Sequence, residues 1–411
     1  MVSPFMADAE KLAAVRAALP ALAAGIYLNA GSVGPLPAEV AAAMAEVEAY
    51  ERDIGRSHLD YFLGHVERMA EARAGIAAVL GADLEEVAIT HATTDGMSIA
   101  TWGLDWQRGD RAVTTTQEHA GALGPLYAVR DRFGVELAFA DVGDGSDDDR
   151  TLEAFERAIG AGVRLVAISH VLWSTGAVLP VARIAALARE HGAVVVVDGA
   201  QAAGAIPVAV QELGIDAYAV SGQKWLLGPE GTGALWVAAA SMDRIRPSAA
   251  GYWSLASHDS AGAAAWHPDA RRFEGSGYHR PSIVGLARSV GWLQMYVGLE
   301  YVHRHGAEMA GRAADALAAI PGVTVLTPRA QMATLVAFRI QGWDPQAALD
   351  EIGARVFAIA RTVPLIDAIR ISVGFYSSED EIDRFVEAVR LLAVHSPATL
   401  PPRRTLTILG E

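Results

Sequence analysis

The chain has 411 residues, of which 52% are apolar and 20% charged, and its formal net charge is −15. This length is enough for about two to three domains with a large buried core. The negative charge argues against nucleic acid and against a polybasic membrane anchor, because both need a basic surface. No apolar run reaches the ~18 residues of a membrane span, and the N-terminus shows no signal-peptide pattern.

The absence of cysteine excludes several kinds of chemistry. It rules out disulfides, thiolate metal sites, iron–sulfur clusters and a cysteine nucleophile. The 12 histidines show no metal-binding spacing, since His303 and His305 lie two residues apart in a helical stretch and do not share a face. We therefore expect a cytoplasmic protein without a metal site that binds a small molecule.

The first 80 residues are predicted to be mainly helical. One helix covers 7–24, and a second helical region over 37–80 has a break near Gly55. From about 85 to 240, short apolar runs alternate with helical stretches, which is typical of β/α units and a mainly parallel sheet. The predicted strands of this region are 87–90, 112–116, 135–141, 165–169, 194–197, 217–220 and 234–237.

The region after residue 240 is predicted to start with long loops and to end as a smaller α+β domain. Loops cover 240–282 and a helix covers 283–318. The later elements are strands at 323–326, 334–340, 355–360 and 368–373 and helices after Asp344 and at 378–394. The predicted fold class is α/β, with an N-terminal helix (1–25), a large domain (26–282) and a small C-terminal domain (283–411). The tail 395–411 is expected to be loosely held.

Lysine is rare in this chain, which makes each lysine informative. Of 33 basic side chains only two are lysines, Lys11 and Lys224. Lys11 lies in an Ala-rich helical pattern, where a solvated surface lysine is expected. Lys224 lies in Ser-Gly-Gln-Lys-Trp, just after the strand predicted at 217–220. Any chemistry that needs a primary amine therefore points to Lys224.

Asp198 follows the most apolar strand, the valine run 194–197. A carboxylate at the carboxyl end of a parallel strand faces the ligand crevice, although it could also be a helix N-cap. Lys224 follows the next strand, so both side chains are expected at one edge of the sheet. Such a pair suits a cofactor with a pyridine ring: the carboxylate keeps the ring nitrogen protonated and the lysine forms a Schiff base with the aldehyde.

Two further groups follow strands of the same sheet. Thr93 and Thr94 begin a helix after the first strand, where they could bind a phosphate or act as a plain N-cap. His119 follows the second strand and could stack on a flat ring or serve as a structural hydrogen-bonding residue, and His170 has the same two interpretations. Farther along the chain, Arg370 interrupts an apolar strand pattern. Arginine binds carboxylates by a two-pronged contact, although in a chain with 31 arginines a surface charge is the other interpretation.

Taken in order, these residues resemble the class V aminotransferases, a branch of the fold-type-I pyridoxal-phosphate enzymes that includes cysteine desulfurases. The similarity runs from about residue 26 to residue 394. The most specific signal is Asp198-Gly199-Ala200-Gln201 together with Ser221-Gly222-Gln223-Lys224 at this spacing. The other matching stretches are Ala92-Thr93-Thr94, Gln117-Glu118-His119-Ala120, Ser169-His170-Val171 and Arg272-Phe273-Glu274.

The resemblance implies pyridoxal 5'-phosphate as cofactor and a homodimer. It implies that Lys224 forms the Schiff base, that Asp198 contacts the pyridine nitrogen and that His119 stacks on the ring. The implied cofactor-binding set is Thr93, Thr94, His119, Asp198, Gln201, Ser221, Gln223, Lys224 and Ser276, with Gln201 near the phenolic oxygen and Ser276 on a segment that reaches the partner subunit's phosphate. The implied substrate-binding set is Arg370, Arg361 and Trp173, where Trp173 replaces an asparagine of the desulfurases.

The resemblance also limits the reaction. A persulfide-forming desulfurase is excluded because the chain lacks the sulfur-carrying cysteine, and the loop between Arg361 and Arg370 is cut short. The expected reaction is β-elimination by a C–S lyase of the cysteine/cystine type, which needs no protein cysteine. Alternatives are a class V aminotransferase and an isopenicillin-N-epimerase-like enzyme, since all three start with removal of the Cα proton by the lysine.

Two other classes of protein are disfavoured. A Rossmann-type dinucleotide-binding protein would open its first β/α unit with G-x-G-x-x-G, which this chain lacks. A catalytically silent, ligand-sensing relative would not need the complete set of Asp198, Lys224 and Arg370.

Overall fold

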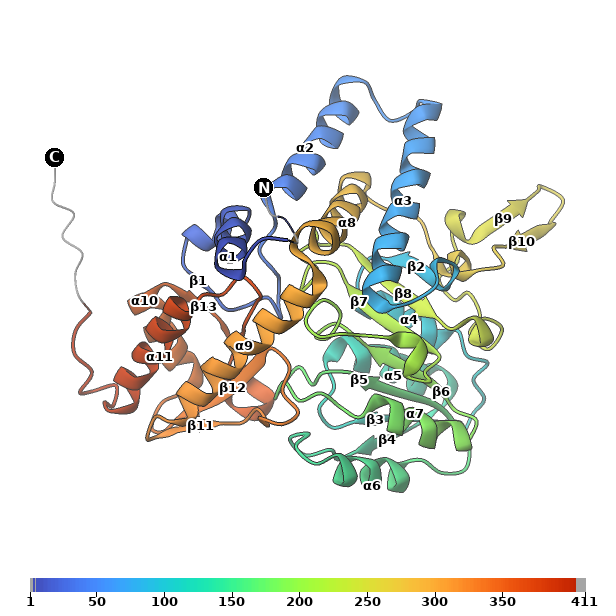
Figure 1. The fold of residues 1–411 in the computed structure, drawn as a ribbon. Coiled ribbons are helices and arrows are strands. Elements are labelled where there is room, and N and C mark those ends of the chain that lie inside the picture. Colours follow the sequence, from blue (N-terminus) through green and yellow to red (C-terminus); the bar gives the residue numbers. More distant parts are fainter. Residues whose placement is uncertain (1–2, 4, 404–411) are drawn as a thin grey trace.

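The centre of the molecule is a seven-stranded sheet with the order β2-β8-β7-β6-β5-β3-β4 (Figure 1). The computed structural model describes residue 3 and residues 5–403. Strand β8 runs antiparallel to both of its neighbours, whereas the other neighbouring strands are parallel. The strands are β2 (Val87–Thr90), β3 (Arg111–Thr115), β4 (Glu136–Ala140), β5 (Val163–Ser169), β6 (Val194–Asp198), β7 (Ala217–Ser221) and β8 (Gly233–Val237). The predicted α/β fold with a mainly parallel sheet is confirmed.

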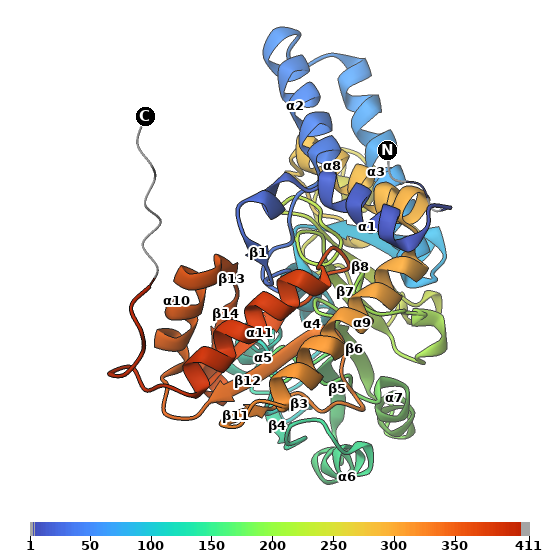
Figure 2. The ribbon, with the colours of Figure 1, turned by 60° about the vertical axis from the view of Figure 1, so that its left-hand side comes forward.

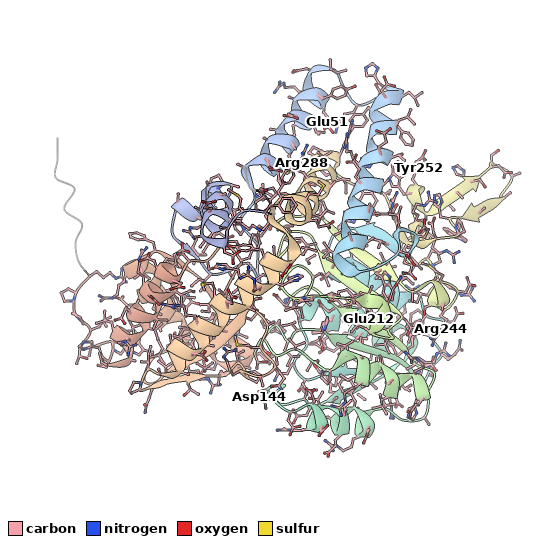
Figure 3. The ribbon with its side chains drawn as sticks, in the orientation of Figure 1. Glu51, Asp144, Glu212, Arg244, Tyr252 and Arg288 are labelled. Atoms are coloured by element: carbon pink, nitrogen blue, oxygen red, sulfur yellow. The ribbon has the colours of Figure 1, made fainter. Side chains whose placement is uncertain are left out.

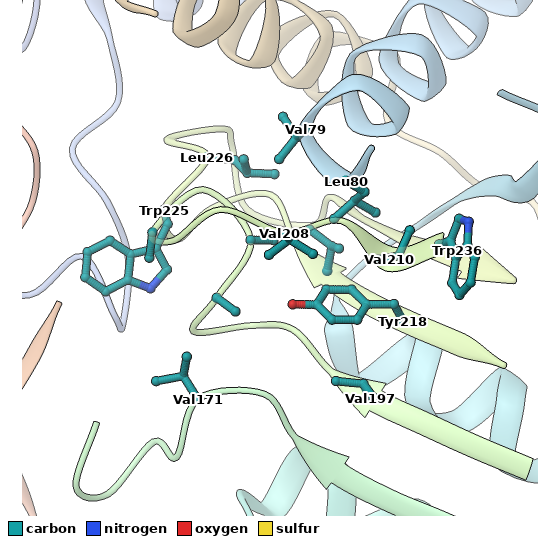
Figure 4. Close-up of a cluster of buried hydrophobic side chains, with 14 of the residues drawn as sticks. Val79, Leu80, Val171, Val197, Val208, Val210, Tyr218, Trp225, Leu226 and Trp236 are labelled. Carbon is teal, nitrogen blue, oxygen red and sulfur yellow. The ribbon is translucent and has the colours of Figure 1, made fainter. Parts of the chain in front are cut away.

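Helices cover both faces of this sheet, and each face has its own hydrophobic core. Along β6, Val195 and Val197 belong to the core shared with α3 and α7, whereas Val194 and Val196 belong to the core shared with α4 and α5. Figure 4 shows part of the first core around Val197 and its neighbours. The continuous valine run is therefore explained by burial on both faces. The helices of this part are α2 (Ala38–Asp53), α3 (Leu59–Leu80), α4 (Thr93–Trp102), α5 (Ala120–Phe133), α6 (Asp148–Ala158), α7 (Val181–Glu190) and α8 (Arg280–Trp292).

A second, four-stranded antiparallel sheet, β11-β12-β15-β14, lies in the C-terminal part and packs against α9, α10 and α11 (Figure 2). The N-terminal strand β1 (Ile26–Tyr27) pairs in parallel with β13 (Ala358–Ile359). The other elements are β11 (Val323–Val325), β12 (Leu335–Ile340), β14 (Arg361–Val363), β15 (Ala368–Ser372), α1 (Asp8–Ala17), α9 (Leu299–Ala318), α10 (Pro345–Val356) and α11 (Glu379–Ala393). The division of the chain at residues 25 and 282 stays a proposal.

The structure differs from the sequence predictions in three places. The region 240–282 contains an antiparallel hairpin, β9 (Leu255–His258) with β10 (Ala264–Trp266), in addition to loops. The helix predicted over 283–318 is divided by a π-helical turn and by Gly298, whose positive φ of 87° interrupts the helix. The strand predicted over 355–360 is shorter because α10 continues to Val356.

The predicted break near Gly55 is confirmed, since α2 ends at Asp53 and α3 begins at Leu59. Of the predicted tail, residues 404–411 lie outside the described residues, and Arg403 forms an ion pair with Glu351. Within the described part of the chain, the helices are all too short or too polar to cross a membrane.

Candidate active site

The order of the strands reverses between β3 and β5. After β3 the chain forms β4 on one side of it, and the next strand, β5, lies on the other side. In open α/β sheets, the crevice at the carboxyl ends of the strands beside such a reversal is the usual ligand site. The carboxyl ends of β3, β5, β6 and β7 are followed by His119, His170, the Asp198 turn and Lys224, as the sequence predicts.

Asp198 and Lys224 lie at this edge. Asp198 ends β6, is 6% exposed, and its Oδ1 accepts a hydrogen bond from the backbone N–H of Ala200 at 2.9 Å. Burial lowers the pKa of the Lys224 amine, the nearby Asp198 charge opposes this shift, and Arg370 and Arg361 add to it. An amine with a lowered pKa is more often neutral, which is the form that attacks an aldehyde or removes a proton.

His119 lies beside this pair as the N-cap of α5. Its Nδ1 accepts a hydrogen bond from the backbone N–H of Gly121 at 3.0 Å, which fixes the orientation of the imidazole. The ring lies 5.3 Å from the Trp173 ring, edge to face. Desolvation and the charge of Lys224 lower the pKa of His119. The structure therefore presents a neutral, oriented aromatic ring next to the amine and the carboxylate.

A group of hydroxyls gathers at the N-terminus of α4. The N-cap residue of this helix provides no side-chain cap. Thr93 Oγ1 and Ser221 Oγ are 2.7 Å apart, and Thr94 Oγ1 comes so close to Gly121 that a Cβ there would lie 2.5 Å from it. The Oε1 atom of Gln223 is buried without a hydrogen-bond partner in the described residues. A helix N-terminus with free hydroxyl and amide groups suits a phosphate.

Two arginines face each other across β14 and β15 next to these groups. Arg361 pairs in register with Arg370, and the Arg361 guanidinium lies 5.8 Å from the Trp173 ring centroid. Arg370 is fully buried; its Nη1 donates to the Trp173 carbonyl, while Nε and Nη2 have no partner in the described residues. Burial, followed by the charge of Arg361, lowers the pKa of Arg370 to about 9, so the group is still cationic at pH 7.

The unpartnered guanidinium atoms indicate what this part of the site binds. Leaving buried donors without partners costs free energy unless a ligand provides acceptors. Ser372 Oγ, two residues after Arg370, is also buried without a partner among the described residues. A planar carboxylate matches the fork of a guanidinium. We expect the carboxylate of a substrate to bind here.

Gln201 connects the two halves of the site. Its Nε2 donates to the Gly31 carbonyl at 2.8 Å, and its Oε1 accepts from the Trp225 indole at 3.0 Å. A Cβ on Gly31 would lie 2.7 Å from Ser372 Oγ and 2.9 Å from Gln201 Oε1, so a larger residue here would displace these side chains. The predicted contact of Gln201 with a cofactor oxygen stays a prediction.

Two sequence expectations have different outcomes. Lys11 was expected on the surface, but this is wrong: it is 5% exposed, with Nζ 5.1 Å from the Tyr301 ring, because α1 packs on α9. Ser276 is exposed and, among the described residues, forms no hydrogen bond with the other candidate residues, and the neighbouring Tyr278 donates to the Ile89 carbonyl of its own chain. A role for Ser276 across a subunit interface stays a prediction.

His170 has the structural role that the sequence left open. Its Nδ1 lies 2.9 Å from the Tyr218 hydroxyl, and its backbone N–H donates to the Asp198 carbonyl at 2.9 Å. Burial lowers the pKa of His170 to about 4. Sequence reasoning missed this pair and also missed Glu118, a buried carboxyl group directly before His119.

The pKa of His170 predicts how stability changes with pH. The imidazole binds a proton less readily in the folded protein than in the unfolded chain. Its contribution to the free energy of unfolding is therefore complete above pH 6.5 and is lost as the pH falls through 4. This loss amounts to about 3 kcal/mol. We expect His170→Gln to remove this pH-dependent loss. The free energy of unfolding of the variant should then decrease less between pH 7 and pH 4 than that of the native protein. An equal decrease in both proteins would contradict a buried neutral His170.

The described residues fit pyridoxal 5'-phosphate at this edge. The hydroxyls at α4 match the phosphate, Asp198 the pyridine nitrogen and Lys224 the aldehyde, while the unpartnered Arg370 atoms remain for an amino-acid carboxylate. Fold and site together define a fold-type-I pyridoxal-phosphate enzyme.

Comparison with known proteins identifies the family. Residues 26–385 match the model of the class-V aminotransferases. The chain is similar to a probable cysteine desulfurase of Methanothermobacter thermautotrophicus (26% identity; 92% of this chain, 97% of the relative) and to isopenicillin N epimerase of Streptomyces clavuligerus (29%; 89% and 94%). Among solved structures it is similar to the cystine C–S lyase C-DES in complex with its product cysteine persulfide (29% identity; 90% and 99%; TM-score 0.85). The chain belongs to the class V aminotransferase family and is related to cysteine desulfurases and C–S lyases.

Proposed function

We propose that this enzyme is a C–S lyase that performs β-elimination on a sulfur-bearing amino acid of the cysteine or cystine type. One observation carries the proposal: a chain without cysteine retains a complete lysine, aspartate and arginine site. Without a protein thiol to accept sulfur, the sulfur must leave in a small molecule. Support comes from the similarity to C-DES, which is named a cystine C–S lyase.

In the proposed reaction, Arg370 binds the α-carboxylate of the substrate and orients its Cα. Lys224 Nζ then takes the Cα proton, and Asp198 keeps the pyridine nitrogen protonated. Bound pyridoxal phosphate supplies an aldehyde for the substrate amine and an electron sink. The Cβ–S bond breaks as the Cα electron pair forms a Cα–Cβ double bond, and the sulfur leaves as a thiolate or persulfide anion that takes up the proton held by Lys224 Nζ. Water then converts the remaining enamine to pyruvate and ammonia.

The other predicted residues have proposed roles in holding the cofactor. Thr93, Thr94, Ser221 and Gln223 bind the phosphate, His119 stacks on the ring, and Gln201 lies near the phenolic oxygen. Arg361 and Trp173 are proposed to contact the substrate together with Arg370.

We also propose that the enzyme is a cytoplasmic homodimer in which Ser276 reaches the site of the partner subunit. Support comes from exposed apolar residues at the protruding α2–α3 hairpin: Ile54 directly after α2, and Leu59 and Leu63 on α3. Tyr252, at the base of the β9–β10 hairpin, contacts Phe62 of α3 edge to face at 6.3 Å, which extends this apolar surface (Figure 3).

Two related reactions are the alternatives. An aminotransferase and an epimerase would use the same removal of the Cα proton, and the similarity to isopenicillin N epimerase supports the second. The test is to incubate the holoenzyme with L-cystine, L-cysteine and a panel of other amino acids, with and without a keto acid. Pyruvate from the sulfur amino acids alone supports the lyase. Exchange of amine with the keto acid, or an inverted stereocentre without pyruvate, would replace the lyase with one of the alternatives.

Replacing Arg370 tests its proposed contact with the substrate. Arg370→Lys retains a positive charge but loses the planar fork. We expect KM to rise by about one to two orders of magnitude while kcat changes less, because a contact made equally to substrate and transition state is lost. The visible absorbance of the resting cofactor should stay unchanged. A change in this absorbance with an unchanged KM would place Arg370 at the cofactor instead.

A further inference from the structure

Strands β3 and β5 separate at the reversal of the sheet. Their register pairs run only from Arg111 to Val113 on β3, whereas β3 remains paired with β4 as far as Thr115. Beyond Val113, a side chain replaces the backbone pairing: Thr114 Oγ1 donates to the Ala167 carbonyl at 2.8 Å. The two strand ends next to the site therefore need other groups to hold them together.

The Glu118 carboxylate lies in this gap. Its Oε1 accepts hydrogen bonds from the backbone N–H of Ser169 at 3.0 Å and from Thr115 Oγ1 at 2.9 Å. Its Oε2 accepts from Ser169 Oγ at 2.5 Å. A carboxylate can accept all three bonds because it has only acceptor atoms. One side chain thus connects the end of β3 to the end of β5.

Both connected ends carry groups of the active site. Glu118 directly precedes His119, and Ser169 pairs in register with Asp198. Burial raises the pKa of Glu118 to about 7, hydrogen bonds from Ser169 oppose this, and the charge of Asp198 adds to it. Glu118 is thus connected through Ser169 to the strand position beside Asp198.

We propose that Glu118 is a positioning residue that fixes His119 relative to Asp198, so that His119 can stack on the face of the pyridine ring while Asp198 contacts the ring nitrogen. This inference rests on the cofactor roles proposed above for His119 and Asp198, and it does not depend on which reaction follows. If the ends of β3 and β5 move apart, His119 and Asp198 cannot both contact the ring, so cofactor affinity falls.

The test is Glu118→Gln at pH 8, where the native side chain, with its pKa raised to about 7, is mainly ionised. The amide retains the shape but removes the negative charge that strengthens the hydrogen bonds from Ser169 and Thr115. We expect the dissociation constant of pyridoxal phosphate from the protein to rise about tenfold, the range expected when a buried donor loses a charged partner. The pH titration of the visible absorbance of the bound cofactor should also shift, because the contact of Asp198 with the ring changes. KM should change less than kcat, since Arg370 is untouched.

Glu86→Gln is the matched control. Glu86 is a buried carboxylate that accepts from the Trp236 indole at 2.9 Å and from the Ala239 N–H at 2.8 Å, at the amino end of β2. Glu86→Gln should lower the melting temperature without changing the dissociation constant of pyridoxal phosphate or the pH titration of its absorbance. A Glu118→Gln protein that behaves in the same way would overturn the proposal.

A second variant keeps the proposal testable if Glu118→Gln does not fold. Ser169→Ala removes only the hydroxyl and leaves the backbone hydrogen bond. We expect a rise of about threefold in the same dissociation constant, because one of the three hydrogen bonds is lost. An unchanged constant would overturn the proposal. Since cofactor binding is measured directly, failure of the proposed lyase reaction would leave this result unaffected.

Discussion

Lys224→Ala is expected to abolish both the visible absorbance of the lysine-bound cofactor and the turnover of any amino acid. Lys224 is the amine at the sheet edge; it is partly buried, and its lowered pKa favours the neutral form. Removing it deletes the nucleophile for the cofactor aldehyde and the base for the Cα proton. We expect turnover to fall by about three orders of magnitude or more. Absorbance spectra of the purified protein with added pyridoxal phosphate, and pyruvate release from L-cystine, are the measurements.

The other lysine provides the control. The chain has only two lysines, so Lys224→Ala and Lys11→Met each leave a protein with one. Lys11 lies against Tyr301, so its replacement should change stability and leave absorbance and turnover as they are. A Lys224→Ala protein that is coloured and active would move the catalytic amine elsewhere and end the proposed mechanism.

The places of Asp198 and Lys224 at the sheet edge could be predicted from the sequence because both follow strands with a clear apolar pattern. Val194–Asp198 is buried on both faces, and this leaves a continuous apolar run that ends in a charged residue. Parallel strands bring such ends to one edge, so the placement of Asp198 and Lys224 at the same edge follows from local pattern and topology together. Because the chain has only two lysines, the candidates for a catalytic amine were limited to Lys11 and Lys224.

Other features depend on contacts that no local pattern records. The burial of Lys11 results from the packing of α1 against α9, almost 300 positions away in the sequence. The role of Glu118 depends on the separation of β3 from β5, and a glutamate before a histidine looks like an ordinary first-turn residue. The β9–β10 hairpin escaped prediction because its strands are short and mostly exposed, so they lack the alternation that burial of one face produces.

Asp198→Asn is the second replacement with a large expected effect. The amide retains the shape of the side chain and can still accept the Ala200 hydrogen bond, so we expect the protein to fold and to retain the cofactor. A neutral amide does not hold the pyridinium proton, so the bound cofactor becomes a weaker electron sink. If about 3 kcal/mol of this charge interaction is felt in the transition state, kcat should fall by two decades or more.

The matched control for Asp198→Asn lies at the other end of the same pair of strands. Asp216 is a buried carboxylate whose Oδ2 accepts from the Val195 N–H at 2.8 Å and whose Oδ1 accepts from Arg244 at 2.8 Å. Asp216→Asn should lower the melting temperature and leave kcat within a few-fold, because it is remote from the cofactor edge. Steady-state kinetics and a pH titration of the cofactor absorbance distinguish the two variants. A loss of less than about fivefold for Asp198→Asn would contradict the assignment, because a charge partner of the pyridine nitrogen must contribute more than 1 kcal/mol to the transition state.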